Sequence, residues 1–496
     1  MSDILGNLNP RAVFHYFEEM TKIPRESGNE AAISQYLVDF ANEHGLEVIQ
    51  EPCKNVIIKK PATAGYENAP RVILQGHMDM VCVKDDELEF DFETQALPIY
   101  VEGDWIKSKG TTLGADNGIA VAMSLAILAD KTMAHPALTV LVTTEEETGM
   151  DGVMALDPAH VQGDILINID SEEEGVALAS CAGGVRNSLK LPLEWMTLSD
   201  NSLVSYEVVI SGLKGGHSGI EINKCRANAN KLMGRFFHYV QDLQVSVAHV
   251  AGGEKMNAIS KRAKMVLTLS KDKVSTLEEK VKDFEIMIGE EKISWYEIMI
   301  RAEFETADQD ITLKLAPVAT ELKVWTAETL QKVTHILQLI PYGPQTMSAN
   351  VAGLVESSSN IGVVEMTESE IEFNSAVRSS VGSLKREINH RIQAIADLTG
   401  AKMELIADYP EWEFETDSKI RDIMKEVYER TAGKELEVSA IHAGLECGFL
   451  SQKLGKIDMI SIGPDITGAH TPKESLSISS TERVYDFLCQ VLKEIK

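Results

Sequence analysis

The chain has 496 residues, too many for one ordinary hydrophobic core, and therefore predicts two or three domains. Its composition, with 44% hydrophobic and 25% charged residues, is typical of a soluble globular protein. The formal net charge of −29 would repel nucleic acid and anionic membranes, so we expect neither as a partner. Solubility alone is a sufficient reason for such a charge.

The N-terminal segment and the cysteine spacing also favour a cytoplasmic protein. The segment Met1–Asn7 has neither the basic nor the apolar region of a secretory signal, and no stretch of the chain approaches the length of a membrane span. The six cysteines are scattered and form no CxxC pair, which predicts reduced thiols and not a disulfide framework.

The first strong strand of the chain ends in a histidine and an aspartate. Two helices and two short strands are expected before it, at Pro10–Met20, Asn29–Glu43, Val48–Ile49 and Asn55–Ile58. The apolar run Val72–Leu74 then leads into Gly76-His77-Met78-Asp79. Residues two apart on a strand share a face, so Asp79 can lie beside the His77 ring or stabilise the loop around it. An isolated HxD of this kind is more often a plain turn than a metal site.

A second polar position follows in a glycine-rich loop. The segment Lys109–Gly118 contains Gly114-Ala115-Asp116-Asn117 and opens the apolar helix Ile119–Leu128. Asp116 therefore stands where the loop becomes a helix. It is either a helix cap, a position that aspartate favours, or a carboxylate directed into a cleft.

Two further buried strands end in acidic residues. The apolar strand Leu138–Val142 is followed by Glu145-Glu146-Glu147, three neighbouring carboxylates whose mutual repulsion favours a bound cation. The strand Ile165–Ile169 ends in Asp170. Strands that alternate with helices predict an α/β sheet, and such sheets place their sites at the carboxyl ends of the strands.

The pattern changes after the first sheet and returns near the C-terminus. Residues 187–405 read as an inserted α+β domain of two similar βαββα halves, an internal duplication, with unrelated halves as the alternative. The helices expected in these halves are Asn228–Val240, Thr276–Met287, Thr326–Leu339 and Leu384–Leu398, and one expected strand is Met347–Val351. The first domain, residues 1–186, then resumes over residues 406–496, where the strand Met459–Ile462 precedes His470.

The strand-end residues form a set that suits two metal ions about 3.5–4 Å apart. His77 and Asp170 can serve one ion, Glu147 and His470 the other, and Asp116 can bridge them. A set of nitrogen and oxygen ligands without thiolate suits zinc, or cobalt or manganese if these are supplied. Glu146 is left beside the metals without being needed as a ligand, which is the position that a general base requires.

The order HxD, GADNG, EExG, a strand-end aspartate and a C-terminal histidine resembles the co-catalytic zinc peptidase family, over nearly the whole chain. Three segments resemble in particular its bacterial aminoacyl-histidine-cleaving members: Lys109–Gly118, Leu213–Gly219 and Ile441–Gly448. The resemblance implies a catalytic domain with a mixed central sheet, interrupted by a lid domain. It also implies two Zn²⁺ ions, hydrolysis of unblocked dipeptides including β-alanyl-histidine, and Asp79 standing behind the histidine ligand as part of the catalytic group.

The same resemblance implies that His217, Asn257 and Arg378 of the lid bind the substrate, with His217 also stabilising the oxyanion. From the residues alone, His217 in its glycine-rich loop reads as a solvent-exposed histidine, and Arg378 as an arginine paired with a surface carboxylate. His442 and Glu446 have no role that can be derived, and a structural one is the default. The sequence does not decide whether the protein forms a homodimer.

The expected function is therefore metal-dependent hydrolysis of a dipeptide. One alternative is an N-acyl amino acid deacylase or a broader di- or tripeptidase of the same family, because the metals and base would be identical. The non-enzymatic alternative is a metal-binding protein that has lost catalysis, and an intact Glu146 speaks against it.

Overall fold

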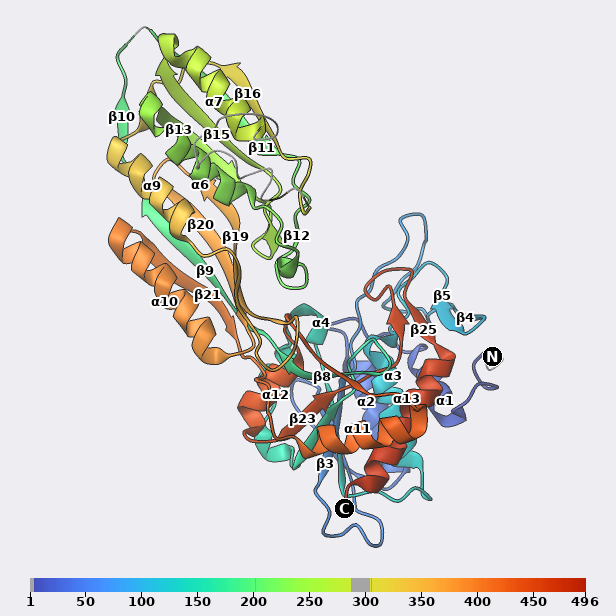
Figure 1. Ribbon diagram of the computed structural model, residues 1–496. Coiled ribbons are helices and arrows are strands. Elements are labelled where there is room, and N and C mark those ends of the chain that lie inside the picture. The colour runs from blue at the N-terminus through green and yellow to red at the C-terminus, as the bar shows by residue number, and fades with distance from the viewer. Residues whose placement is uncertain (1–3, 201, 287–303, 305) are drawn as a thin grey trace. The chain divides into compact units, whose positions relative to one another are not determined.

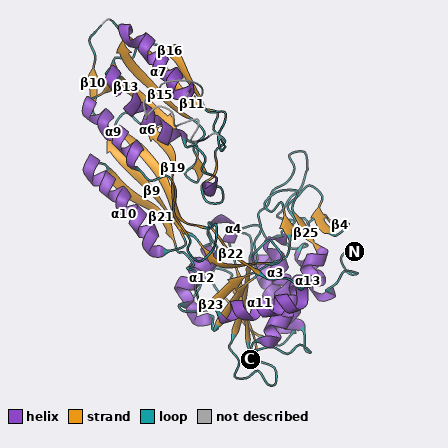
Figure 2. Ribbon diagram, in the orientation of Figure 1, coloured by secondary structure: helices purple, strands orange, loops and turns teal. Residues whose placement is uncertain are grey.

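The computed structural model describes residues 4–200, 202–286, 304 and 306–496, and the chain divides into two compact units. Unit 1 comprises Met1–Ser180, Phe414–Ala440 and Leu445–Lys496, and unit 2 comprises Cys181–Glu413 and Ile441–Gly444. Figure 1 labels many of the elements of both units, and Figure 2 colours helices, strands and loops differently.

Unit 1 is built on a mixed sheet that, within the described residues, has eight strands in the order β1-β2-β6-β3-β7-β23-β8-β22. The strands are β1 (Glu47–Gln50), β2 (Val56–Lys60), β3 (Val72–His77), β6 (Leu138–Thr143), β7 (Ile165–Asn168), β8 (Val176–Cys181), β22 (Glu437–Ile441) and β23 (Asp458–Ser461). The central strands β6, β3, β7 and β23 are parallel, whereas β1 and β2 are antiparallel to their neighbours. The expected mixed sheet is thus confirmed.

Every residue of β3, β6 and β7 is buried, as their continuous apolar sequences predict. The helices of unit 1 are α1 (Arg11–Met20), α2 (Ala31–Glu43), α3 (Ala115–Ala129), α4 (Glu146–Gly149), α5 (Asp151–Ala155), α11 (Lys419–Ala432), α12 (Glu446–Leu454) and α13 (Ile478–Glu494). Most of α3 is buried, which follows from its almost wholly apolar sequence. Helices and sheet share one hydrophobic core.

A small sheet of four strands completes unit 1 in the described part of the chain, in the order β24-β25-β5-β4. Its strands are β4 (Ile99–Glu102), β5 (Trp105–Ser108), β24 (Ile466–Thr467) and β25 (Ser475–Ser477). The loop between β24 and β25 carries His470, whose backbone is left-handed with φ of 61°. The β25–β5 pairing therefore ties the C-terminal histidine loop to the first third of the chain.

Unit 2 contains, within the described residues, a sheet with the strand order β16-β11-β15-β13-β19-β20-β9-β21, and β18 pairs with β19. The strands are β9 (Gly183–Pro192), β11 (Leu203–Ser211), β13 (Ser246–Gly252), β15 (Ala263–Ser270), β16 (Thr312–Val318), β18 (Gly343–Met347), β19 (Val355–Met366), β20 (Glu370–Ser379) and β21 (Lys402–Tyr409). Two pairs lie off this sheet: β10 (Trp195–Thr197) with β17 (Lys323–Trp325), and β12 (Gly216–His217) with β14 (Ala258–Ile259). The expected boundaries at 186/187 and 405/406 fall inside β9 and β21, which pair with each other and so belong to one unit.

In the described part of unit 2, four helices pack on this sheet and share its core: α6 (Ala229–Tyr239), α7 (Val274–Ile286), α9 (Ala327–Leu339) and α10 (Gly382–Thr399). The order helix, antiparallel strand pair, helix occurs twice, as α6-β13-β15-α7 and as α9-β19-β20-α10. Duplication of the halves stays a prediction. The expected strand Met347–Val351 is wrong, because only Met347 is in a strand and the residues after it turn towards β19. The last residue of the expected helix Thr276–Met287 lies outside the described residues.

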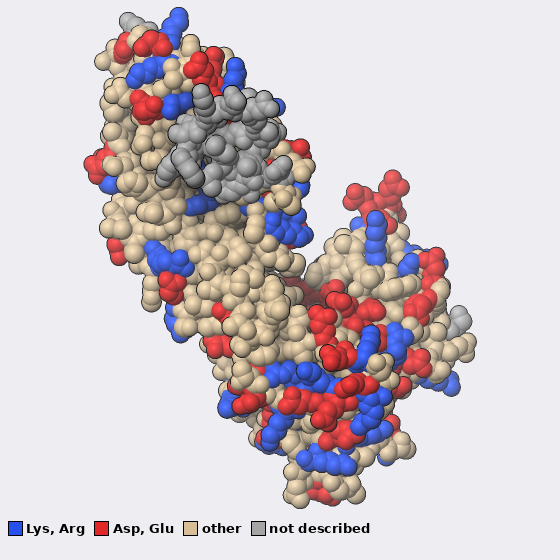
Figure 3. Space-filling view, in the orientation of Figure 1, with Lys and Arg blue, Asp and Glu red and all other residues tan. Residues whose placement is uncertain are grey.

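Two expectations from composition can be compared with the structure. The six cysteines are all free thiols, as predicted. In the described part of the chain, each helix is too short or too polar to cross a membrane. On the face drawn in Figure 3, acidic and basic side chains are interspersed and form no field of a single sign.

The partly buried Lys231 joins α6 to the end of α9. Its Nζ donates to the carbonyl oxygens of Leu337, Gln338 and Ile340 at 2.6, 2.7 and 2.7 Å, where the last carbonyls of a helix have no partner within the helix. We expect Lys231→Met to destabilise unit 2 by about 1–3 kcal/mol, because buried carbonyls lose their donor. Urea denaturation measures this loss.

The matched control is Lys332→Met on α9, because Lys332 pairs with an exposed Glu328. An exposed pair of this kind contributes at most about 1 kcal/mol. Equal losses for the two variants would contradict the role of Lys231 as a link between the helices.

Candidate metal centre

Three neighbouring parallel strands bring acidic residues and a histidine to one edge of the unit 1 sheet. His77 is the last residue of β3, Glu146 and Glu147 follow β6, and Asp170 follows β7. Because β3 pairs in parallel with both β6 and β7, the carboxyl ends of all three strands meet at this edge. Asp116 at the start of α3 and His470 between β24 and β25 reach the same place.

His77 is the centre of the cluster and is 1% exposed. Its Nε2 lies 3.2 Å from Asp116 Oδ1, 3.6 Å from Asp170 Oδ1 and 4.0 Å from Glu146 Oε2. Burial by itself lowers the pKa of His77, but its hydrogen bonds with Asp116, Asp170 and Asp79 raise that pKa well above its usual value. The imidazole is thus held in a strongly negative environment.

His470 closes the other side of the cluster and is half exposed. Its Nε2 lies 3.1 Å from Asp116 Oδ2 and 2.9 Å from Glu147 Oε2. Hydrogen bonds with Asp116 and Glu147 raise the pKa of His470 to about 11. The two oxygens of Asp116 therefore face different histidines, which is the arrangement that a bridging carboxylate needs.

Ligand atoms close enough to share one ion form three groups in the described residues. They are His77-Asp116-Asp170, Asp116-Glu147-His470 and His77-Glu146-Glu147. The first two share Asp116 and contain the five residues expected as metal ligands. The third contains Glu146, which had been expected beside the ions and not on them.

The donor set fits divalent cations. Each ion pair made by Asp116, Glu146, Glu147 and Asp170 in the described residues is with a histidine, so these acids have no lysine or arginine to balance them. Glu147 Oε1 is buried and has no hydrogen-bond partner there, although a buried carboxylate oxygen is costly to leave unpaired. Mixed imidazole and carboxylate ligands suit zinc, cobalt or manganese.

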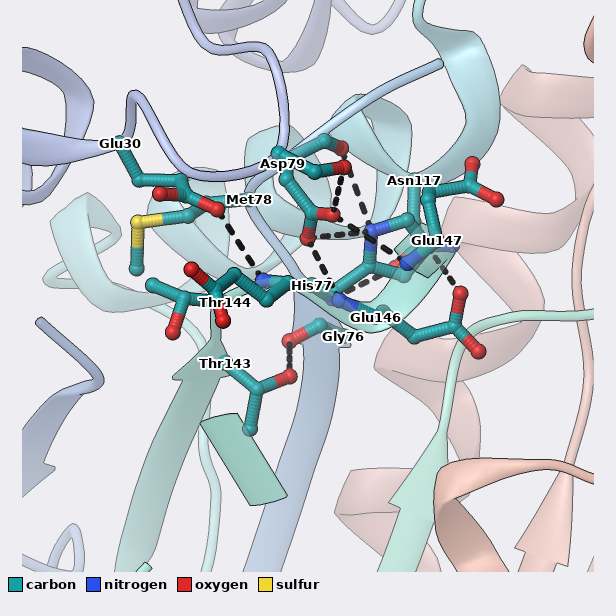
Figure 4. Close-up of polar contacts among 12 residues, drawn as sticks. Glu30, Gly76, His77, Met78, Asp79, Asn117, Thr143, Thr144, Glu146 and Glu147 are labelled. Carbon is teal, nitrogen blue, oxygen red and sulfur yellow. Dashed lines mark hydrogen bonds and ion pairs between the residues drawn. The ribbon is translucent and has the colours of Figure 1, made fainter. Parts of the chain in front are cut away.

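Asp79 lies beside the His77 ring, as Figure 4 shows. It is fully buried, and its Oδ1 lies 3.3 Å from His77 Nδ1. The backbone amides of Glu146 and Glu147 donate to Asp79 at 3.2 and 3.3 Å, and Ser27 Oγ donates at 2.7 Å. Asp79 therefore orients the histidine ring and the glutamate-bearing turn together.

Glu146 has the properties of a proton acceptor held near ligands. Burial raises its pKa well above the usual value, and repulsion by Asp170, Glu446 and Glu147 adds to this while His77 opposes it. A carboxylate whose pKa is raised binds a proton more readily, as a general base requires.

Residues that the sequence analysis had not given a role support the strand ends. The Asn117 amide donates to Ile169 O at 2.7 Å and accepts from His77 N at 3.2 Å, so it joins the ends of β7 and β3. Gly76 permits this approach, because a Cβ there would lie 2.3 Å from Asn117 Oδ1. The only sequence signal was the place of Asn117 beside Asp116 in the glycine-rich loop.

Next to the cluster, hydrogen bonds link buried polar side chains of β3, β6, β7, β23 and α12. Ser461, Asn168 and Gln75 are linked by hydrogen bonds of 2.5 and 2.6 Å, and Gln75 donates to Glu446 Oε2 at 2.6 Å. Thr143 also donates to this oxygen, at 2.7 Å. Burial raises the pKa of Glu446 to about 7. Glu446 thus has a place in the support of the site.

The residues expected to bind substrate lie together in unit 2. His217 on β12 pairs with Ala258 beside Asn257, and Ser218 N donates to Asn257 O at 2.9 Å. Gly219 lies against His217 and Arg378, since a Cβ on it would be 3.0 Å from His217 Cε1 and 3.2 Å from Arg378 Nε. The structure therefore brings His217, Asn257 and Arg378 into one neighbourhood.

His217 and Arg378 differ from the exposed residues that local sequence suggests. The backbone amides of Gly219 and Ile220 donate to His217 Nδ1 at 3.3 and 3.2 Å, so the neutral ring carries its proton on Nε2. Burial and the neighbouring Arg378 lower the pKa of His217. Arg378 Nη1 donates to Tyr409 Oη at 2.9 Å, while its buried Nε has no partner in the described residues.

His442 also belongs to this neighbourhood of unit 2. Its Nε2 lies 2.7 Å from Ser358 Oγ, and a Cβ on Gly219 would be 2.7 Å from its carbonyl oxygen. Burial lowers the pKa of His442 to about 3, and the charge of Arg378 acts in the same direction. His442 is therefore a neutral histidine in the neighbourhood of Arg378.

Comparison with known proteins agrees with this architecture. The profile of peptidase family M20/M25/M40 matches residues 73–494. The chain is 36% identical over 492 residues to the cytosol non-specific dipeptidase of Escherichia coli (strain K12), with 99% of each chain covered. A crystal structure of aminoacylhistidine dipeptidase from Vibrio alginolyticus is similar with a TM-score of 0.93 and 35% identity, covering 99% of this chain and 98% of that one. Aminopeptidase PepT from Bacillus cereus shares the fold, with a TM-score of 0.55, 13% identity, and coverage of 98% and 99% of the two chains.

We expect Asp116→Ala to prevent the binding of both ions together, because each ligand group loses its shared carboxylate. The variant should also lose the thermal stabilisation that added metal confers, which for a tightly bound ion reaches about 4 kcal/mol at roughly 1,000 times Kd. Elemental analysis and melting curves with and without Zn²⁺ measure the two effects. Glu173→Ala, at an exposed position near Asp170, is the control. Retention of one ion at full occupancy with an unchanged melting temperature would show that Asp116 does not bridge.

Proposed function

The chain belongs to peptidase family M20/M25/M40, and we propose that it hydrolyses the peptide bond of unblocked dipeptides, Xaa-His dipeptides among them, with two divalent ions, Zn²⁺ in the first instance. The observation that carries the proposal is the pair of ligand groups that share Asp116, with Glu146 beside both. The names of the two relatives, a non-specific dipeptidase and an aminoacylhistidine dipeptidase, support the substrate class. The cytosolic E. coli relative supports a cytoplasmic location.

In this proposal His77 and Asp170 would hold one ion and Glu147 and His470 the other, and Asp116 is the residue that the two ligand groups share. When bound there, such ions would polarise a scissile carbonyl and lower the pKa of water. Glu146 takes a proton from the attacking water at its carboxylate and returns it to the leaving amine. Asp79 Oδ1 accepts the Nδ1–H of His77. This contact favours the tautomer whose unprotonated Nε2 faces the cluster.

Unit 2 is proposed to supply the groups that recognise the dipeptide. The Nε2–H of neutral His217 is a donor suited to the developing oxyanion, a contribution typically of about 3–4 kcal/mol. Arg378 retains a free Nε–H donor beside that histidine, and a guanidinium binds a carboxylate through two parallel hydrogen bonds. Asn257, on the strand turn that pairs with His217, completes the proposed substrate-binding set.

A panel of substrates tests the function. We expect Zn²⁺-loaded protein to cleave free dipeptides such as β-Ala-His and Gly-His, and to act poorly on N-acetyl amino acids. The reverse preference would favour the deacylase alternative. Absence of turnover on both sets, with two ions bound, would favour a metal-binding protein without catalysis.

We expect Glu146→Gln to lower kcat by at least about 100-fold while both ions stay bound, because the amide keeps the shape of the side chain but cannot accept the proton. Steady-state kinetics and elemental analysis are measured on the same preparation. Glu145→Gln makes the same change one residue away and should retain activity. Activity within tenfold of the parent would exclude Glu146 as the base, and loss of an ion would make Glu146 a ligand, as the third group of ligand atoms permits.

We expect Arg378→Ala and Arg378→Lys to lower kcat/KM on a free dipeptide, with a loss of about 2–5 kcal/mol of transition-state stabilisation. Alanine removes the guanidinium, and lysine cannot reproduce its two parallel hydrogen bonds. The parent should act poorly on the same dipeptide with an amidated C-terminus. On that substrate the variants should lower kcat/KM little further. Kinetics on the four combinations of parent or Arg378→Ala with acid or amide give the coupling. Arg186→Ala, on an exposed position of β9, is the control. Equal losses on acid and amide would show that Arg378 does not bind the carboxylate.

A further inference from the structure

Glu474 is a buried acid four residues beyond His470, and it binds the backbone that leads to Asp116. It is 2% exposed. Its Oε2 accepts from Leu113 N and Gly114 N at 2.7 and 3.0 Å. Its Oε1 accepts from Ala115 N and Asp116 N at 2.7 and 3.2 Å. Four consecutive amides thus use the acceptor capacity of one carboxylate.

Arg25 binds the carbonyl side of the same turn. It is also 2% exposed, and its Nη2 donates to Gly114 O at 2.5 Å. Its Nη1 donates to Met78 O at 3.0 Å and to Asp79 O at 3.4 Å. Gly114 is left-handed, and a Cβ there would lie 2.3 Å from Arg25 Nη2, so this turn needs glycine.

These two side chains connect three loops that carry the proposed ligands. Arg25 joins the loop after His77 to the loop before Asp116, and Glu474 joins the latter to the loop that holds His470. The loops come from distant parts of the chain, because Glu474 and its four amide donors are 358 to 361 residues apart in sequence. Neither side chain is among the groups of potential ligand atoms.

We propose that Arg25 and Glu474 are positioning residues that clamp the Gly114 turn from its two sides and thereby place the Asp116 carboxylate between the His77 and His470 sites. The clamp binds backbone groups and so fixes the position of the Asp116 backbone. The two carboxylate oxygens of Asp116 then contact His77 and His470. This inference rests on the metal centre of the proposed function and is independent of the substrate.

The physical consequence is a dependence of metal affinity on two residues that touch no metal. In Glu474→Gln, an NH₂ group replaces one acceptor and faces backbone amides that are themselves donors, so the turn must shift or leave buried donors unpaired. A shift of the turn moves Asp116 relative to both histidines. Loss of a residue that orients ligands typically weakens metal binding by about 10–100-fold.

The test measures Co²⁺ binding to the full-length apoprotein in competition with a chelator, together with the visible spectrum of bound Co²⁺, which reports its coordination. We expect Glu474→Gln to weaken Co²⁺ binding at least about tenfold for the pair of ions and to alter the spectrum. Arg25→Lys, which keeps the charge but loses the planar fork, should act in the same direction. It also serves as the deciding variant if Glu474→Gln does not fold.

The matched control is Glu18→Gln in the same unit. Glu18 is 4% exposed and accepts from Ile4 N and Leu5 N at 3.0 and 2.8 Å, far in sequence from the ligand loops. A merely structural role predicts that both glutamine variants lower the melting temperature of the apoprotein and leave Co²⁺ affinity and spectrum unchanged.

Parent-like Co²⁺ affinity in Glu474→Gln, or in Arg25→Lys where that variant decides, would overturn the clamp. Metal binding is read here without substrate, so this failure leaves the proposed peptidase activity standing. A parent protein that bound no Co²⁺ would overturn both the clamp and the metal centre.

Discussion

Electrostatic repulsion among acidic side chains is the constraint around which unit 1 is built. Asp79, Asp116, Glu146, Glu147 and Asp170 converge where the parallel central strands of the sheet end. Only two imidazoles face them in ion pairs within the described residues. Such a group is costly to bury unless cations and directed hydrogen bonds offset the repulsion. For Asp79, the surrounding structure supplies such hydrogen bonds from two backbone amides and a serine hydroxyl.

Neutral and backbone groups hold the acids in place without competing for the ligand atoms. Asp79 receives two backbone amides and a serine hydroxyl, so its charge serves to orient His77. Gln75 and Asn168 occupy the positions two residues before His77 and Asp170 on the same strand faces, and they form a hydrogen-bonded layer beneath the ligands. Amides are suited to this layer because each both donates and accepts without adding charge.

The polar cluster of unit 2 differs from that of unit 1 in its charge. His217 and His442 are kept neutral by burial and by the nearby charge of Arg378, so their ring nitrogens are available as hydrogen-bonding groups at neutral pH. Arg378 has a tyrosine hydroxyl as its partner in place of a carboxylate, which leaves its positive charge uncompensated by any ion pair in the described residues. The two units thus separate a negative cluster suited to cations from a cluster that carries a guanidinium and neutral donors.

The amino-acid sequence by itself determined the strand-end residues and the class of chemistry. His77, Glu147 and Asp170 stand at or just beyond the ends of apolar runs, and the hydrophobic pattern of such runs can be read from the local sequence. The ligand count led us to expect that Asp116 bridges two ions and that Glu146 is not needed as a ligand, and both roles stay predictions. The structure places both side chains within the cluster. The alternation of strands and helices was sufficient for the mixed sheet.

Only the tertiary structure decided which distant residues hold these positions. Locally, Arg25 and Glu474 look like any arginine or glutamate beside a turn, and their importance arises because folding brings them to one backbone segment across 89 and about 360 residues. The boundary between the units was likewise decided by pairing, because β9 and β21 join one sheet from opposite ends of the insertion. A turn after Met347 replaced an expected strand for the same reason: the partners of a strand are long-range, and local propensity does not specify them.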